Sequence, residues 1–126
     1  MSLCLLSAGS TLLLSISAFS LSWTHSVEKV RWQEEWHISQ AGLELTMARV
    51  KGSGAGMEPG DDAVLTEGWW QWQPDLPPQK ELRLAASGAT GTGWTLCHTQ
   101  ACLELAAQAG EPVRLWACDR LEVNVD

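Results

Sequence analysis

The sequence predicts an all-β fold, a single-domain sandwich or closed barrel of about nine or ten short strands within residues 1–126. Apolar and polar residues alternate with a period of two through most of the chain, as on strands that bury one face. No stretch keeps the three- and four-residue apolar spacing of a long helix. Turn-forming residues recur between the short apolar segments, which is typical of sandwiches and barrels.

The composition indicates a protein with a packed core and excludes one class of partner. A chain of 126 residues, 45% of them hydrophobic, is long enough to bury a core. Eight Trp residues are present, and an indole N–H needs a partner when buried, so we expect several indoles to be half-buried. The net charge of −7 speaks against nucleic acid as a partner, because binding a phosphate backbone requires clustered Lys and Arg.

The first eighteen residues allow two interpretations. Residues 3–7 and 11–16 alternate like two strands joined by a turn at 7–10. Residues 12–19 also resemble the apolar core of an export signal, but no basic segment precedes them. Serines interrupt the stretch too often for a clear membrane span. This balance slightly favours the cytoplasm over the periplasm or a membrane-associated location.

A hairpin is predicted next. In residues 29–39, Val30, Trp32, Trp36 and Ile38 share one face, and Glu34 falls among them. The segment Gln40-Ala41-Gly42 turns the chain into a strand that places Leu43, Leu45 and Met47 on one face.

The remaining strands follow a glycine-rich loop. We expect strands in the ranges 63–66, 68–73, 80–87 and 112–118, with a hairpin at 93–105 and a break at 74–78. Residues 101–109 have a weak helical propensity, so a small α+β fold is the structural alternative.

Four cysteines, at positions 4, 97, 102 and 118, allow three pairings if all are oxidised. A hairpin would bring Cys97 and Cys102 within bridging distance. Free buried thiols in a reducing compartment are the alternative. A Cys/His metal site is disfavoured because Cys97 and Cys102 have no second matching pair.

The segment Thr24-His25-Ser26-Val27-Glu28 carries the chemistry-bearing side chains of the candidate site. An imidazole, hydroxyls and a carboxylate are the groups needed for proton transfer. On an extended strand, however, His25 and Ser26 point to opposite faces, so they form no Ser-His pair without a bulge. We therefore expect either a tight corner hydrogen-bonded within itself or a binding patch, and assign no catalytic residue.

Two further features complete the candidate site. Glu34, set among apolar neighbours, should either escape burial near a sheet edge or find a donor such as His25, Arg49 or a bound cation. Gly54 and Gly56, in Gly52-Ser53-Gly54-Ala55-Gly56, allow a close backbone approach beside His25 and Glu28, although no dinucleotide or phosphate-loop motif is complete.

The tryptophans at 69, 70 and 72 have two interpretations. Alternation sends Trp70 and Trp72 to one face and Trp69 to the other. Packing in the core is the simpler expectation, and stacking on a sugar or another flat ligand is the alternative.

These motifs resemble a known family. The segments 19–29, Glu34-Glu35, 52–59 and 68–70, in this order and spacing, are similar to the uncharacterised bacterial family called domain of unknown function 1850, and the similarity extends from about Leu3 to Cys118. The resemblance implies a small bacterial protein often encoded beside the fused permease of a TRAP-type transporter with a TAXI-type binding protein. It transfers no activity, and its motif positions here are Thr24, His25, Ser26, Glu28, Gly54 and Gly56.

The residues predict a β-rich binding protein with no cofactor and no metal, and the resemblance implies an accessory role in solute uptake with a small ligand or a transporter component as its partner. Its expected site is Thr24, His25, Ser26, Glu28, Glu34, Gly54 and Gly56. A hydrolase-like enzyme using His25 and Glu28 is one alternative, and a purely structural interaction module is another.

Overall fold

A computed structural model describes residues 2–24, 30–51, 63–86, 93–99, 101–107 and 109–118. The described residues form strands and no helix. The strands are β1 (Ser2–Ser7), β2 (Ser10–Leu14), β3 (Ala18–Thr24), β4 (Arg31–Ser39), β5 (Gly42–Lys51), β6 (Val64–Thr66), β7 (Trp69–Trp72), β8 (Glu81–Ala86), β9 (Trp94–Cys97), β10 (Cys102–Leu105) and β11 (Gly110–Cys118).

The strands form two antiparallel sheets arranged as a sandwich, so the all-β prediction is confirmed and the closed-barrel variant is wrong. One sheet has the order β2-β1-β11-β8, and the other has the order β10-β9-β3-β4-β5-β7-β6. The α+β alternative is also wrong, because the weakly helical segment contains strand β10, whose backbone pairs with β9.

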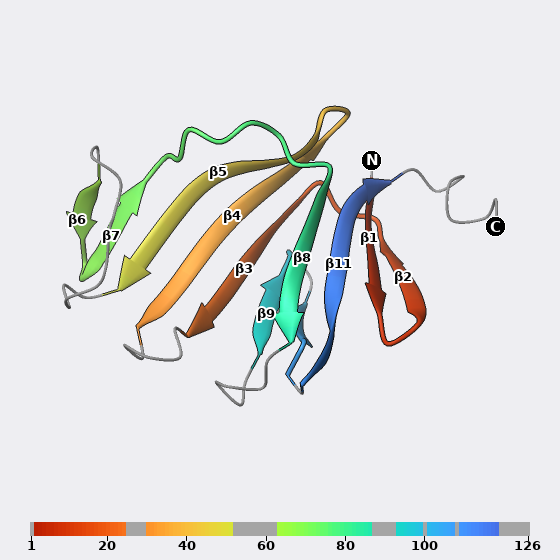
Figure 1. The fold of residues 1–126 in the computed structure, drawn as a ribbon. Helices are drawn as coiled ribbons and strands as arrows, with labels where there is room; N and C mark the ends of the chain where they lie inside the picture. The colour runs from red at the N-terminus through yellow and green to blue at the C-terminus, as the bar shows by residue number, and fades with distance from the viewer. Residues whose placement is uncertain are drawn as a thin grey trace.

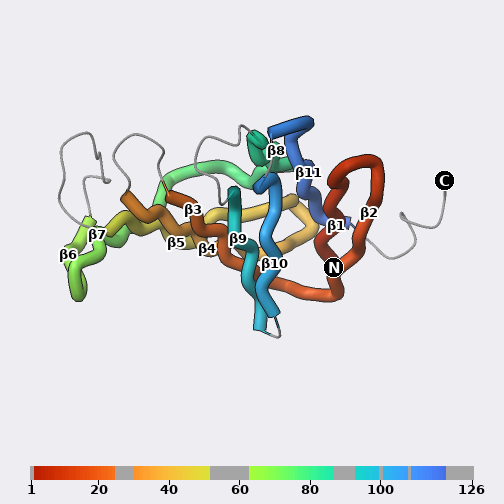
Figure 2. Tube along the Cα trace, turned by 90° about the horizontal axis from the view of Figure 1, so that it is seen from below, coloured from red at the N-terminus to blue at the C-terminus, as the bar shows by residue number. Residues whose placement is uncertain are grey.

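The core lies between the two sheets. Leu3, Leu21, Leu43, Leu96 and Leu115 are fully buried in it and come from β1, β3, β5, β9 and β11. Figure 2 shows β8 and β11 on one side of the layer formed by β3, β4 and β5. Strands β6 and β7 supply no member of this core among the described residues, and in both views they lie at the far end of the molecule from β1 and β2 (Figures 1 and 2).

The first residues of the chain belong to this core. Strand β1 pairs with β2 on one side and with β11 on the other, and Leu3 and Leu5 are buried. The strand interpretation of this segment is therefore confirmed. Among the described residues, no helix has the length and apolar character needed to cross a membrane.

A bulge in β5 changes which of its side chains face the core. Glu35 pairs with Met47, whereas the next residue, Trp36, pairs with Leu45, so Thr46 is an extra residue in β5. Its hydroxyl donates a hydrogen bond of 3.1 Å to the Glu35 carbonyl. Because an extra residue inverts the alternation, Met47 lies on the outer face, and its predicted place beside Leu43 and Leu45 is wrong.

The segment between β7 and β8 carries the chain from one sheet to the other. It crosses above the ends of the strands in Figure 1 and contacts the β4–β5 hairpin, where Leu43 and Gln79 exchange backbone hydrogen bonds of 2.7 and 2.8 Å. Gly42 has φ +127°, and a Cβ at this position would lie 2.5 Å from the Gln79 carbonyl oxygen. The crossing therefore requires glycine at the predicted turn.

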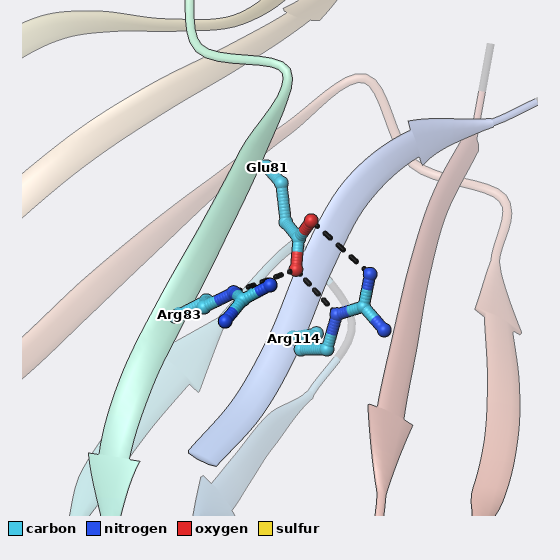
Figure 3. Close-up of polar contacts among 3 residues, drawn as sticks. All are labelled: Glu81, Arg83 and Arg114. Carbon is cyan, nitrogen blue, oxygen red and sulfur yellow. Dashed lines mark hydrogen bonds and ion pairs between the residues drawn. The ribbon is translucent and has the colours of Figure 1, made fainter.

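A shared carboxylate joins β8 to β11 on the outside of the four-stranded sheet. Arg83 and Arg114 are directly opposite each other across the two strands, an arrangement of like charges that is unfavourable alone. Glu81 accepts hydrogen bonds from the Nε atoms of both arginines and a third, of 3.2 Å, from Arg114 Nη2 (Figure 3). The bonds from Arg114 chiefly hold the pKa of the Glu81 carboxyl below its usual range.

All four cysteines are paired. Cys4 and Cys118 join β1 to β11 over a sequence separation of 114 residues, and both are buried. Cys97 and Cys102 are direct partners in the β9–β10 hairpin, with a Cα–Cα distance of 4.1 Å. The hairpin bridge predicted from spacing is confirmed, and the free-thiol alternative is wrong.

Candidate functional site

The structure describes two of the predicted site residues, Thr24 and Glu34. The others lie outside the described residues, namely His25, Ser26, Glu28, Gly54 and Gly56. For these five, the structure locates only the strands on either side. The hydrolase-like alternative, which depends on His25 and Glu28, also stays untested.

The strands that flank the two motif segments meet at one end of the seven-stranded sheet. Strand β3 ends at Thr24, which pairs with Arg31 at the start of β4. The β4–β5 register pairs Trp32 with Val50, so the end of β5 at Lys51 falls beside Arg31. Thr24, Arg31 and Lys51 are therefore neighbours. Thr24 and Arg31 flank segment 25–29, and Lys51 comes just before segment 52–62.

The outer face at this end carries polar and basic side chains in two rows. The first row crosses β3, β4, β5 and β7 through the pairs Ser22–Gln33, Gln33–Arg49 and Arg49–Gln71. The second row contains the pairs Thr24–Arg31, Lys51–Trp69 and Thr66–Trp69. Directly paired residues project to the same face, so these side chains share one surface, which we call the basic face.

Contacts hold the cations of the basic face in place. Arg49 Cζ lies 5.0 Å from the ring centroid of Trp69, and Lys51 Nζ lies 5.5 Å from the same centroid. Both distances suit a cation–π interaction. Arg49 Nε donates a hydrogen bond of 2.9 Å to Gln33 Oε1, and Arg31 Nη2 donates one of 3.3 Å to Ser22 Oγ.

The charge of the basic face contrasts with that of the chain. The structure describes six lysines and arginines, of which Arg31, Arg49 and Lys51 are three, in a protein of net charge −7. Among the described residues, the salt bridges of the structure join Arg83 and Arg114 to Glu81, and none involves these three cations. Among the residues that the structure describes, positive charge therefore gathers at this end of the sheet.

Two hollows indent the same face. One, of about 290 Å³, is lined by residues that include Thr24, Arg31 and Glu104, which bring a hydroxyl and both signs of charge together. The other, of about 440 Å³, is lined by residues that include Glu35, His37 and His98. Within the described ranges, no group of three or more His, Cys, Asp or Glu residues is placed to hold a metal ion.

Glu34 lies on the opposite, inner face. It pairs with Leu21 on one side and with Ala48 on the other, in the middle of the sheet, so the prediction of an edge position is wrong. Its carboxylate accepts a hydrogen bond of 3.1 Å from Trp36 Nε1. Burial raises the pKa of the Glu34 carboxyl above its ordinary value, and the bond from Trp36 opposes part of that effect.

The donor of Glu34 differs from the one that the sequence suggested. Arg49 projects to the outer face and bonds Gln33, so it does not reach Glu34. A donor two residues further along the same strand is the simplest one available, because alternate side chains share a face. Glu34 and the basic face are therefore on opposite sides of the sheet.

Tryptophans line the inner face beside Glu34. Trp23 and Trp32 stack with ring centroids 6.1 Å apart, and Trp72 meets Trp32 edge-to-face at 6.3 Å. Trp70 and Trp72 project inward and Trp69 outward, as alternation predicted. Trp36 is buried and the other seven indoles are half-buried, which confirms the expectation from composition.

The basic face was not predicted from the sequence. The available signal was the alternation of Arg49 and Lys51 with Ala48 and Val50, which indicates one polar face. The bulge at Thr46 hides which face that is, and the pairing of β5 with β7 is not readable from the sequence.

The chain is similar to a known protein family. The family model described as Domain of unknown function (DUF1850) matches residues 19–105, which run from β3 through β10. No curated protein and no solved structure matches the chain. The matched range contains the whole seven-stranded sheet except the first residue of β3, and it leaves out β1, β2 and β11.

Proposed function

The chain belongs to the family described as Domain of unknown function (DUF1850), and from this premise we propose that it is a bacterial accessory protein of TRAP-type solute uptake with a TAXI-type binding protein. In this proposal it binds a small solute or a transporter component and catalyses no reaction. The binding site is the end of the seven-stranded sheet at which β3, β4 and β5 begin or end.

One observation carries the proposal. The strand ends beside the two motif segments, Thr24, Arg31 and Lys51, are neighbours at one end of the sheet. Segments that enter and leave the same sheet end are well placed to form one site, because binding residues are commonly on loops positioned by a rigid scaffold. The polar side chains of the motif, His25, Ser26 and Glu28, are suited to bind polar groups of a ligand.

The disulfides support a location of the protein outside the cytoplasm. Both cysteine pairs are oxidised, and disulfides persist in oxidising compartments such as the bacterial periplasm. A periplasmic setting also suits a partner of a solute-binding protein. We therefore favour the periplasm over the cytoplasm that the sequence slightly favoured.

A ligand screen by thermal shift tests the binding proposal. The full chain is screened against organic acids, amino acids and divalent ions, and each hit is repeated with the variants His25→Ala and Glu28→Ala. A ligand that binds the folded state raises the melting temperature, so the expected result is stabilisation that is lost in both variants.

The matched control is His37→Ala, which removes an imidazole near the opposite end of β4. It should keep the ligand-induced shift. Stabilisation that survives both His25→Ala and Glu28→Ala would exclude the motif as the site. For the transporter arm, the purified binding protein and permease replace the small molecules, with the same three variants.

A further inference from the structure

We propose that the basic face binds a small carboxylate, with Arg49 and Lys51 as its principal charged contacts and Arg31 at its margin. The inference names the ligand class of the binding function proposed above and rests on that function. It concerns described residues, and its three cations are not part of the site predicted from the sequence.

The geometry of Arg49 suits a carboxylate. Its Nε is held by Gln33 and its guanidinium lies against Trp69, so two contacts fix the plane of the group. Its two terminal nitrogens form no hydrogen bond with another described residue. A planar guanidinium with free terminal donors can bind the two oxygens of a carboxylate at once, and a prepositioned side chain loses little entropy on binding.

Lys51 extends the positive charge toward the end of the sheet. It lies two residues beyond Arg49 on the same face of β5, and both contact the ring of Trp69. Arg31 is at the adjoining strand end and also lines the hollow of about 290 Å³. Three cations within neighbouring strands can hold one carboxylate, or two on the same small molecule.

Among the residues that the structure describes, no carboxylate forms a salt bridge with these three cations. Of the described acidic residues near this surface, Glu35 lies one row further along with Met47, and Glu67 is in the turn between β6 and β7. Glu104 lies on β10, four strands from Arg49 and Lys51 on β5, and shares the hollow of about 290 Å³ with Arg31. In contrast, Arg83 and Arg114 share Glu81 directly (Figure 3). Arg49 and Lys51, which form no salt bridge with a described carboxylate, can accept one from a ligand.

The surroundings favour a small solute over a polyanion. Neutral donors and acceptors, Ser22, Thr24, Gln33 and Gln71, lie in the same two rows and can bond hydroxyl or carbonyl groups of the ligand. A net charge of −7 repels a nucleic acid or an anionic membrane, and three cations are too few to overcome it.

The experiment measures the affinity of the full, oxidised chain for succinate, malate and acetate by isothermal titration calorimetry at low salt. Inorganic phosphate and sulfate report a general anion site, and succinamide reports a site that does not need charge. We expect succinate or malate to bind more tightly than phosphate, sulfate and succinamide. Affinity should fall as the salt concentration rises.

Variants test the residues. Arg49→Gln and Lys51→Gln should each weaken succinate binding about tenfold or more, because each removes a charge-assisted hydrogen bond. Arg49→Lys keeps the charge but loses the planar donor pair, and should fall between Arg49→Gln and the wild type. The control is Arg83→Gln, which removes one positive charge from the other sheet and should leave the affinity unchanged. Unchanged melting temperatures show that each variant is folded.

The remaining outcomes distinguish a failure of this inference from a failure of the proposed function. Equal affinity in Arg49→Gln and Arg83→Gln overturns the carboxylate site, as does phosphate or succinamide binding as tightly as succinate. If a neutral solute stabilises the chain in a His25-dependent way and no carboxylate binds, the proposed function stands and this inference fails. If carboxylate binding depends on Arg49 but not on His25 or Glu28, the basic face stands and the motif is excluded as the site.

Discussion

Glu34 shows how a single carboxylate is accommodated on an apolar sheet face. It is set between Leu21 and Ala48, and one hydrogen bond from the indole of Trp36 meets its carboxylate. Neutral donors stabilise a buried charge only in part, so burial still raises the pKa of Glu34. The ionised side chain therefore lowers the stability of the folded state.

The variant Glu34→Gln should be more stable than the wild type at pH 7, by about 1 kcal/mol or less. Because the folded-state pKa of Glu34 is raised, the folded protein binds its proton more tightly than the unfolded chain does. Stability of the wild type relative to the variant is thus highest at low pH and falls as pH rises from the ordinary value through the raised one. Urea unfolding at several pH values from about 3.5 to 7 measures this difference.

The low-pH measurement is the internal control, because both proteins then carry a neutral side chain at position 34. The two unfolding free energies should converge there. A difference that is constant over the whole pH range would show that the ionisation of Glu34 has no effect on stability.

Replacing Gly42 should lower the stability of the folded protein for two separable reasons. Its φ of +127° strains any other side chain, and a Cβ there meets the Gln79 carbonyl oxygen at 2.5 Å. Gly68 has φ +88° but open space around its Cβ, so Gly68→Ala isolates the effect of backbone strain, about 1 kcal/mol. Gly42→Ala should cost at least about 1 kcal/mol more, measured by urea unfolding. Equal costs would show that the Gln79 contact relaxes freely.

At the scale of elements, the period-two pattern predicted most strands because each strand buries one face. The exception is β5, in which the bulge at Thr46 places Leu45 on the inner face and Met47 on the outer face. A one-residue insertion is set by the register with β4, and no local pattern in the sequence marks it. The same bulge sends Arg49 outward, which is why the predicted bond from Arg49 to Glu34 does not form and why the face that carries Arg49 could not be predicted.

The β9–β10 hairpin was predictable because its bridge is local. Its disulfide should be the more easily reduced of the two, since Cys102 is exposed whereas Cys4 and Cys118 are 0% and 1% exposed. Mild treatment of the native protein with dithiothreitol, followed by alkylation and peptide mass spectrometry, should label Cys97 and Cys102 first. Access of the attacking thiolate limits exchange, so labelling of Cys4 and Cys118 at the same rate would contradict this accessibility argument.

At the scale of the whole molecule, the order of the strands in the two sheets could not be predicted from the sequence. Among the described strands, four neighbouring pairs join strands that are not consecutive in the chain, namely β1–β11, β8–β11, β3–β9 and β5–β7. Such pairings depend on how the two sheets cover one core, which alternation alone does not specify. The expected approach of Gly54 and Gly56 to His25 and Glu28 lies outside the described residues, and the structure shows only that the flanking strand ends at Thr24, Arg31 and Lys51 are neighbours. The charge of that surface emerges from the pairing of β5 with β7.

The bond between Cys4 and Cys118 should dominate global stability. It closes a loop of 114 residues and ties β1 to β11, whereas Cys97–Cys102 closes one of 5. Loop-closure entropy in the unfolded chain then gives a loss of about 5 kcal/mol for the double variant Cys4→Ala/Cys118→Ala and about 2 kcal/mol for Cys97→Ala/Cys102→Ala, the matched control. Urea unfolding of both variants compares the two losses. If they were equal, the terminal strands would already be held by packing against the core, and the long loop would add nothing.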